Sequence, residues 1–265
     1  MEFENLSKTY ESRGGTLEAL AGVSFTASRG EFVSIIGPSG CGKSTLLKMV
    51  LGVTPISGGA VRLAGIAING PQVGIGMVFQ TAALPPWRRV LDNVLLPIEV
   101  LSLDKATYRA QAKRLIDMVG LAGFEDKYPK ELSGGMQQRV SICRALIHDP
   151  DLLLMDEPFG ALDALTREVM QVELMRIWRE TGKTVLMVTH SIDEAVLVSD
   201  RVLVMSARPG RIIEEVTIDM ERPRDPDFRT RPEFQDYAHR LRHSLGVADQ
   251  GASGAGAEKP QTTGT

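Results

Sequence analysis

Apolar and polar residues alternate along the first 31 positions of the chain, and an apolar, β-branched run follows at 32–36. The alternation, broken at Gly14-Gly15 and Arg29-Gly30, predicts short antiparallel strands, and the run predicts a buried strand. Similar runs bounded by turn residues predict further strands at 61–68, 74–79, 152–155, 184–189, 201–206 and 211–218. Because strands alternate with helical segments, the predicted fold class is α/β.

Helical spacing of apolar residues appears between these strands. It predicts helices at 46–50, 91–101, 105–120, 134–148, 165–181 and 233–245. We expect a folded region over 1–248, with a helical subdomain at about 92–148 within it. Residues 249–265 are rich in Gly, Ala and Thr and have no apolar period, which predicts a disordered C-terminal tail.

Composition narrows the functional classes. With 265 residues and 43% hydrophobic residues, the chain can build one large core or two small ones. A net charge of −3 disfavours a nucleic-acid partner. The two cysteines form no C-x-x-C pair, which fits a protein of the reducing cytosol. We expect neither a signal peptide nor a membrane span.

A glycine-rich loop follows the buried strand at 32–36 and precedes a helical pattern. It matches G-x-x-x-x-G-K-[ST], in which backbone N–H groups and a helix N-terminus bind phosphate. Lys43 would reach the outer phosphates, and the Ser44 hydroxyl would bind Mg²⁺. The nucleotide can be ATP or GTP, and the output can be a kinase, a switch or a motor. The loop comprises Gly37, Pro38, Ser39, Gly40, Cys41, Gly42, Lys43, Ser44 and Thr45.

Cys41 lies within this loop, next to the N-terminus of the predicted helix. A helix N-terminus lowers the pKa of a thiol. We therefore expect Cys41 to be open to alkylation.

Polar residues end several of the predicted strands: Gln80, Asp156, Glu157 and His190. Because parallel strands end on one edge of their sheet, we expect these side chains to gather beside the phosphate loop. Successive side chains on a strand alternate in direction. One carboxylate of the Asp156-Glu157 pair can therefore bind the water shell of a metal while the other points at a reacting water. The alternative reading is two solvated acids.

A second glycine-rich loop opens the helix predicted at 134–148. Ser133 is its predicted N-cap, and the stretch reads L-S-G-G-M-Q-Q-R over 132–139. The helix N-terminus makes it a second potential phosphate site, although serine before two glycines is also a common capping arrangement.

The phosphate loop, the 132–139 stretch, the acidic strand at 152–157 and His190 together resemble the ABC-type ATPase cassette, throughout residues 1 to about 220. The resemblance implies a P-loop NTPase fold with a mixed sheet core, an antiparallel β subdomain and a helical subdomain. It also implies that two cassettes enclose two ATP molecules head to tail.

The resemblance assigns roles around one nucleotide. Lys43 and the loop amides bind phosphates, while Ser44 and Gln80 serve Mg²⁺. Asp156 holds Mg²⁺ through its water. Glu157 is the general base that polarises the attacking water.

Further assignments come from the same resemblance. His190 contacts the γ-phosphate, and Tyr10 stacks on adenine. Ser133 and Gly135 act on the nucleotide held by the partner copy. Asp163 belongs to the loop that couples the two sites.

Three stretches, 79–94, 156–167 and 222–226, look like the nitrate/sulfonate/taurine group of bacterial importers. The resemblance implies an ATP-hydrolysing importer motor for a small anion, at the cytoplasmic face of the membrane. Its expected partners are a second copy, transmembrane permease subunits and, indirectly, a periplasmic or extracellular substrate-binding protein. In this group the segment after Gln80 faces the membrane subunit, so Trp87 either docks there or packs within the helical insertion.

Two other functions stay open from the sequence. One is a soluble ABC ATPase acting on nucleic acid or ribosomes, although such proteins carry a long coiled-coil insertion or two cassettes in one chain. The other is an ABC motor for a different cargo, such as a pyrimidine-like nutrient or a lipid.

Overall fold

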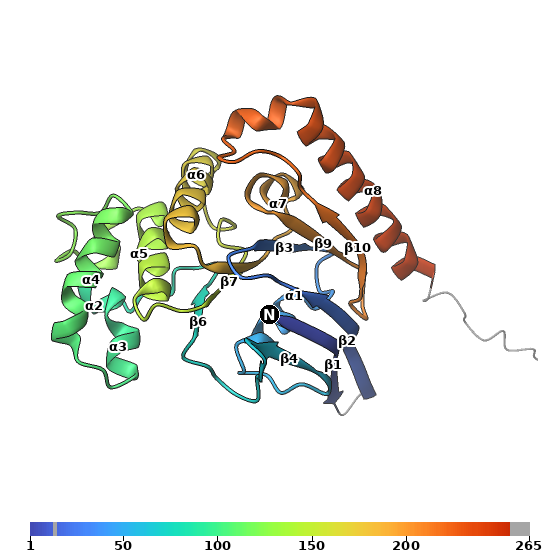
Figure 1. The fold of residues 1–265 in the computed structure, drawn as a ribbon, viewed down its shortest axis with the longest axis horizontal. Helices are drawn as coiled ribbons and strands as arrows, with labels where there is room; N and C mark the ends of the chain where they lie inside the picture. The colour runs from blue at the N-terminus through green and yellow to red at the C-terminus, as the bar shows by residue number, and fades with distance from the viewer. Residues whose placement is uncertain (13–14, 255–265) are drawn as a thin grey trace, which may run out of the picture.

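The computed structural model describes residues 1–12 and 15–254, which form two sheets and the helices that cover them (Figure 1). The larger sheet has six strands in the order β10-β9-β3-β8-β7-β6. Its pairs are parallel except for β10 with β9. The strands are β3 (Phe32–Ile36), β6 (Ile75–Val78), β7 (Leu152–Asp156), β8 (Thr184–Val188), β9 (Arg201–Met205) and β10 (Ile212–Thr217).

Strand β3 shows how this sheet separates two cores. All five of its residues are buried. Phe32 and Ile36 belong to the hydrophobic cluster under α6, α7 and α8, whereas Val33 and Ile35 belong to the cluster around α1 and the smaller sheet. Because successive side chains of a strand point to opposite faces, a fully apolar strand must be covered on both faces.

The smaller sheet is antiparallel, in the order β2-β1-β4-β5. The strand predicted at 61–68 is divided in the structure, because Ala64 and Gly65 adopt positive φ angles of 50° and 81° and turn the chain. The predicted turn at Gly14-Gly15 lies partly outside the described residues. The strands are β1 (Glu2–Ser12), β2 (Gly15–Thr26), β4 (Gly58–Leu63) and β5 (Ile66–Ala67).

The helix predicted at 91–101 is also divided, into α2 and α3. Pro97 lies in the first turn of α3 and has no N–H to continue the hydrogen bonds of α2. Helices α2 to α5 lie together at one end of the molecule, beyond β6 and β7 (Figure 1). The helices are α1 (Lys43–Val50), α2 (Val90–Val94), α3 (Leu96–Val100), α4 (Lys105–Met118), α5 (Gly134–Leu146), α6 (Ala164–Thr181), α7 (Ile192–Val198) and α8 (Pro232–Gly254), with 3-10 turns η1 (Pro129–Glu131) and η2 (Pro226–Thr230).

Helix α8 is longer than the sequence predicted. It continues to Gly254, so the tail expected from residue 249 is wrong for its first part. No proline interrupts the sequence between Pro232 and Pro260, and Val247, Ala248 and Gln250 can all adopt helix. Residues 255–265 of that predicted tail lie outside the described residues.

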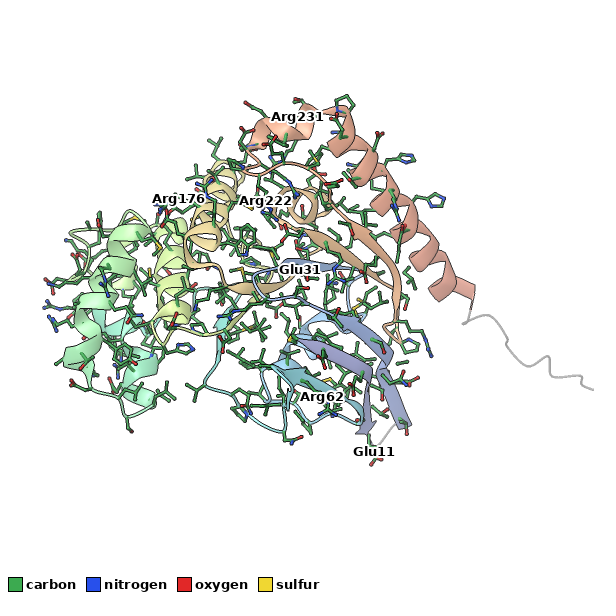
Figure 2. The ribbon with its side chains drawn as sticks, viewed as in Figure 1. Glu11, Glu31, Arg62, Arg176, Arg222 and Arg231 are labelled. Atoms are coloured by element: carbon green, nitrogen blue, oxygen red, sulfur yellow. The ribbon has the colours of Figure 1, made fainter. Side chains whose placement is uncertain are left out.

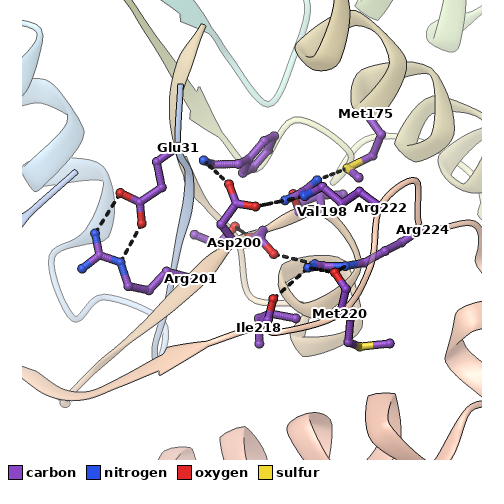
Figure 3. A network of polar contacts seen from close by, with 12 residues as sticks. Glu31, Met175, Val198, Asp200, Arg201, Ile218, Met220, Arg222 and Arg224 are labelled. Carbon is purple, nitrogen blue, oxygen red and sulfur yellow. Dashed lines mark hydrogen bonds and ion pairs between the residues drawn. The ribbon is translucent and has the colours of Figure 1, made fainter. Parts of the chain in front are cut away.

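A partly buried polar network joins β3, β9 and the segment before η2 (Figure 3). Asp200 accepts hydrogen bonds from the Phe32 amide at 2.8 Å and from Nε of Arg222 at 2.9 Å. Arg222 lies over the ring of Trp178, 4.3 Å from its centroid. These contacts fix the chain segment that leads to α8 against the edge of α6.

Charged side chains also tie the helices together at the surface (Figure 2). Arg176 of α6 bonds Glu173 and Glu180 on its own helix and the carbonyl of Met118 at the end of α4. Within the described residues, none of the helices has the length and apolar character needed to cross a membrane.

Candidate functional site: a phosphate loop beside an acidic strand end

The loop between β3 and α1 adopts backbone conformations that require glycine. Gly40 and Gly42 have φ angles of +75° and +109°, which L side chains rarely adopt. A Cβ on Gly42 would lie 2.7 Å from Cδ2 of Leu20, and one on Gly37 would lie 2.9 Å from Cβ of Met205. The bare backbone of the loop can therefore present its N–H groups to an anion at the N-terminus of α1.

Lys43 is the first residue of α1, and its side chain is buried inside the loop. Its Nζ donates hydrogen bonds to the carbonyls of Gly37 at 2.7 Å and Pro38 at 2.9 Å. The ammonium group thus lies where it can exchange these carbonyls for phosphate oxygens.

Asp156 ends β7 and faces the start of α1. The hydroxyl of Ser44 donates to Oδ1 of Asp156 at 3.1 Å. Burial raises the pKa of Asp156, and the hydrogen bond from Ser44 opposes that shift. The pair supplies two adjacent oxygen donors of the kind that Mg²⁺ prefers.

Glu157 and His190 come together from neighbouring strand ends, as the sequence predicted. Glu157 has a positive φ of 46°, and its amide donates to the carbonyl of Val188 at the end of β8. Oε2 of Glu157 lies 3.0 Å from Nδ1 of His190. A carboxylate held by an imidazole at the edge of the phosphate loop can accept a proton from a water molecule.

The phosphate loop and Glu157 line one cavity of about 290 Å³, and Asp156 and His190 bond to its lining residues Ser44 and Glu157 without lining it themselves. Tyr10, near the end of β1, forms part of its wall from the smaller sheet, Thr45 lines it from α1, and Glu157 lines it from the end of β7. Tyr10 is 38% exposed, with Nζ of Lys8 4.8 Å from its ring centroid. Lys8 thus covers one face of the ring, and stacking on a ligand would use the other face.

Gln80 does not line this cavity in the structure. It follows β6 and lies against Gly160, whose Cβ position would be 2.9 Å from Nε2 of Gln80. The amide of Gly160 in turn donates to the carbonyl of Glu157 at 2.9 Å. Gln80 therefore lies at the turn that follows Glu157, beside the site.

The structure places the second glycine-rich loop in a different cavity, of about 460 Å³, which shares no lining residue with the first. Ser133 caps α5 through a hydrogen bond from the Met136 amide at 3.3 Å, and Asp163 caps α6. Gly135 faces Thr166 at the start of α6. Within one copy, these residues and the phosphate loop do not meet.

The sequence analysis missed three residues of the cavity wall: Leu17 and Ala19 of β2, and Arg208. Arg208, in the turn between β9 and β10, lines the cavity and donates to the carbonyl of Gly40. The two residues are 168 positions apart, and the sequence predicted only a hairpin turn there. No local signal connects them.

The predicted reactivity of Cys41 is wrong. The side chain is 1% exposed. Burial raises the pKa of its thiol, and the neighbouring Lys43 only partly opposes the shift. A low-dielectric environment disfavours the thiolate more than the loop favours it.

The segment after Gln80 is anchored on α5, and its tip is exposed. Arg144 donates to the carbonyls of Ala82 and Ala83 at 2.8 and 2.9 Å. Trp87, further along, is 75% exposed. The interpretation that Trp87 packs within the helical insertion is therefore wrong.

Within the described residues, no three His, Cys, Asp or Glu side chains gather into a metal-binding group. Mg²⁺ usually needs only one or two protein carboxylates and keeps several waters. Ser44 and Asp156 fit that requirement.

Comparisons with known proteins agree with this geometry. A family model described as ABC transporter matches residues 20–160. An uncharacterized ABC transporter ATP-binding protein of Methanocaldococcus jannaschii is 50% identical over 245 residues, 92% of this chain and 91% of its own. A taurine import ATP-binding protein of Burkholderia thailandensis is 48% identical over 217 residues, 82% of this chain and 84% of its own.

A solved structure is similar to the fold. It is a dimeric ATP-binding cassette in a post-hydrolysis state, bound to ADP and Pi, with a TM-score of 0.71 and 34% sequence identity. The match covers 83% of this chain and 99% of that one.

Proposed function

Since this chain belongs to the ABC transporter family, we propose that it is the ATP-hydrolysing motor subunit of an importer for a small anion such as taurine. The observation that carries the ATPase assignment is the cavity in which the phosphate loop meets Glu157. Taurine importers among the relatives support the cargo.

We propose that Ser44 and Asp156 hold Mg²⁺ beside the loop. Gln80 is the proposed further oxygen ligand, which requires its side chain to turn from Gly160 toward the cavity. When bound, Mg²⁺ supplies positive charge that neutralises the phosphate oxygens during transfer.

The chain's own groups then do the rest of the chemistry. Lys43 exchanges the carbonyls of Gly37 and Pro38 for phosphate oxygens, and loop N–H groups hold the other oxygens. Glu157 accepts the proton of the attacking water, while His190 orients the carboxylate through Oε2 and reaches the γ-phosphate. Tyr10 stacks on adenine at the open side of the cavity.

The second glycine-rich loop has a role only between copies. We propose that two chains associate head to tail, so that Ser133 and Gly135 of one copy cap the nucleotide held by the other. Asp163 would couple the two sites from its position at the start of α6. The dimeric state of the structurally similar cassette supports this arrangement.

Contact with the membrane subunits is assigned to the segment after Gln80. Trp87 offers an exposed aromatic side chain on a segment that Arg144 holds in place. Aromatic residues on such rigid turns are favoured anchors of protein interfaces. The subunit would thereby be held at the cytoplasmic face of the membrane.

The ATPase assignment is tested with Glu157→Gln in the full-length chain. The variant should bind MgATP but lose about 10²- to 10⁴-fold in turnover, because the amide cannot accept the proton. It should also form an ATP-dependent dimer by light scattering. The matched control is Glu180→Gln, an exposed acid on α6 that pairs with Arg176. Undiminished turnover in Glu157→Gln would contradict the role of this residue.

The transport assignment needs a separate experiment. Tagged Glu157→Gln chain, incubated with ATP and detergent-solubilised membranes, should recover a multi-span membrane protein, and Trp87→Ala in the same background should reduce that recovery. Uptake of labelled taurine by cells should depend on the wild-type chain and fail with Glu157→Gln. Recovery of ribosomal or DNA-bound partners in place of a membrane protein would contradict the importer.

A further inference from the structure

The turn between β9 and β10 lies directly against the phosphate loop. Nε and Nη2 of Arg208 donate to the carbonyl of Gly40 at 3.1 and 2.8 Å. At Gly210, a Cβ would lie 2.2 Å from the carbonyl oxygen of Cys41, so no side chain fits there. The turn therefore touches the loop at two successive residues.

The same turn is bonded to the smaller sheet. The amide of Gly210 donates to the carbonyl of Ala19 at 3.0 Å, and the amide of Ala21 donates to the carbonyl of Gly210 at 3.0 Å. Ala19 and Ala21 belong to β2, which pairs with the strand that carries Tyr10. The turn thus joins the sheet on one side of the cavity to the phosphate loop on the other.

The contact with the Gly40 carbonyl orients the peptide group that joins Gly40 to Cys41. A trans peptide is planar, so its C=O and the N–H of the following residue point in opposite directions. With the carbonyl of Gly40 held by Arg208, the amide of Cys41 points in the opposite direction, toward the carbonyl of Pro38 within the loop. There it donates to the carbonyl of Pro38 at 3.4 Å, a long contact that a better acceptor can replace.

We propose that Arg208 is a positioning residue for nucleotide binding: by holding the carbonyl of Gly40, it directs the Cys41 amide toward the bound phosphates. The proposal rests on the proposed function of the loop. Lys43 also holds loop carbonyls, those of Gly37 and Pro38, but it must release them to reach phosphate. Arg208 acts from outside the loop and keeps its contact when Lys43 moves.

This role makes a specific prediction about two ligands. If Arg208 acts through the loop, its loss weakens every ligand that the loop amides bind, with or without an adenosine group. Replacing Tyr10 should instead weaken ATP alone. Inorganic triphosphate, which lacks adenosine, therefore distinguishes the contribution of the phosphate loop to binding from that of Tyr10.

The test measures dissociation constants of MgATP and of inorganic triphosphate by calorimetry on the full-length chain. Arg208→Gln should raise both by about tenfold, the usual effect of losing a charged hydrogen bond. Arg208→Lys should restore most of the affinity, because an ammonium group can still donate to Gly40. The matched control is Arg211→Gln, which removes an exposed cation from the same hairpin and should change neither constant.

Three results would overturn the proposal: unchanged affinity in Arg208→Gln, a loss for MgATP alone, or an equal loss in Arg211→Gln. If Arg208→Gln lowers the unfolding midpoint, Arg208→Lys carries the test. Any affinity that Arg208→Lys still loses must then be lost by the same factor for the two ligands, and unequal losses would contradict action through the loop. A wild-type chain that binds neither ligand would refute the proposed function itself, so the two failures are distinguishable.

Discussion

Gly135 offers a test in which packing and function can be separated. A Cβ at this position would lie 2.5 Å from Cγ2 of Thr166 but 4.0 Å from its Cβ. The clash therefore involves a single methyl group at the contact between α5 and α6. Gly135→Ala should strain this contact, and Thr166→Ser, which removes the methyl, should relieve it.

The magnitudes follow from two opposing effects. Overpacking a contact of this kind costs about 1–3 kcal/mol. Alanine in place of glycine within a helix returns about 1 kcal/mol. Gly135→Ala should thus destabilise the wild-type chain by up to about 2 kcal/mol, but stabilise the Thr166→Ser chain by about 1 kcal/mol. The assay is denaturant unfolding of the four chains of the double-mutant cycle.

The same effect of Gly135→Ala in both backgrounds would refute the packing argument. ATPase activity then adds the functional half of the test. If the double variant regains stability but not activity, Gly135 is needed at the partner's nucleotide, as proposed. If it regains both, the glycine serves only the contact with Thr166.

Three further predictions concern burial. Arg224→Ala should lower the free energy of unfolding by about 3–5 kcal/mol, because the guanidinium is buried and bonds to four backbone carbonyls between Val196 and Met220. Burial lowers the pKa of Arg224 to about 10, so the side chain is charged at neutral pH. A loss below about 1 kcal/mol, measured by denaturant unfolding, would contradict this role. Burial raises the pKa of Glu194, so its protonated carboxyl favours folding at low pH, and this contribution to stability is lost as the pH rises above the ordinary pKa of the group. The melting temperature of Glu194→Gln should therefore increase relative to that of the wild type between pH 4 and 7. A difference in melting temperature that stays constant over this range would be inconsistent with the raised pKa. Maleimide should label Cys41 and Cys143 only in denaturant, because both are buried with raised thiol pKa values; fast labelling of the folded chain would show that one of them is accessible.

The phosphate loop and the acidic strand ends could be predicted from the sequence because their causes are local. The backbone of the loop itself needs glycine at 40 and 42, because both residues have positive φ angles. Apolar runs of five residues define buried parallel strands, and parallel strands end on one edge. This rule was enough to predict that Glu157 and His190 lie close together, as they do in the structure.

Other features depend on contacts between segments that are far apart in the sequence. Arg208 reaches Gly40 across 168 positions. Cys41 shows the same limit in its chemistry: the helix N-terminus is visible in the sequence, but the burial that outweighs it comes from surrounding segments. Trp87 is exposed because Arg144 of α5 holds its segment at the surface. The pattern of apolar residues within the segment does not predict this contact.

The sequence by itself therefore predicted most of the elements, the polar residues at the strand ends and the chemistry of the loop, since these follow from neighbouring residues, but it missed α7 and the divisions of two elements. Only the tertiary structure decided which side chains complete the cavity, that both thiols are buried and that Trp87 is exposed. Burial and long-range contacts depend on how distant segments pack against one another, so they cannot be predicted from any one segment by itself.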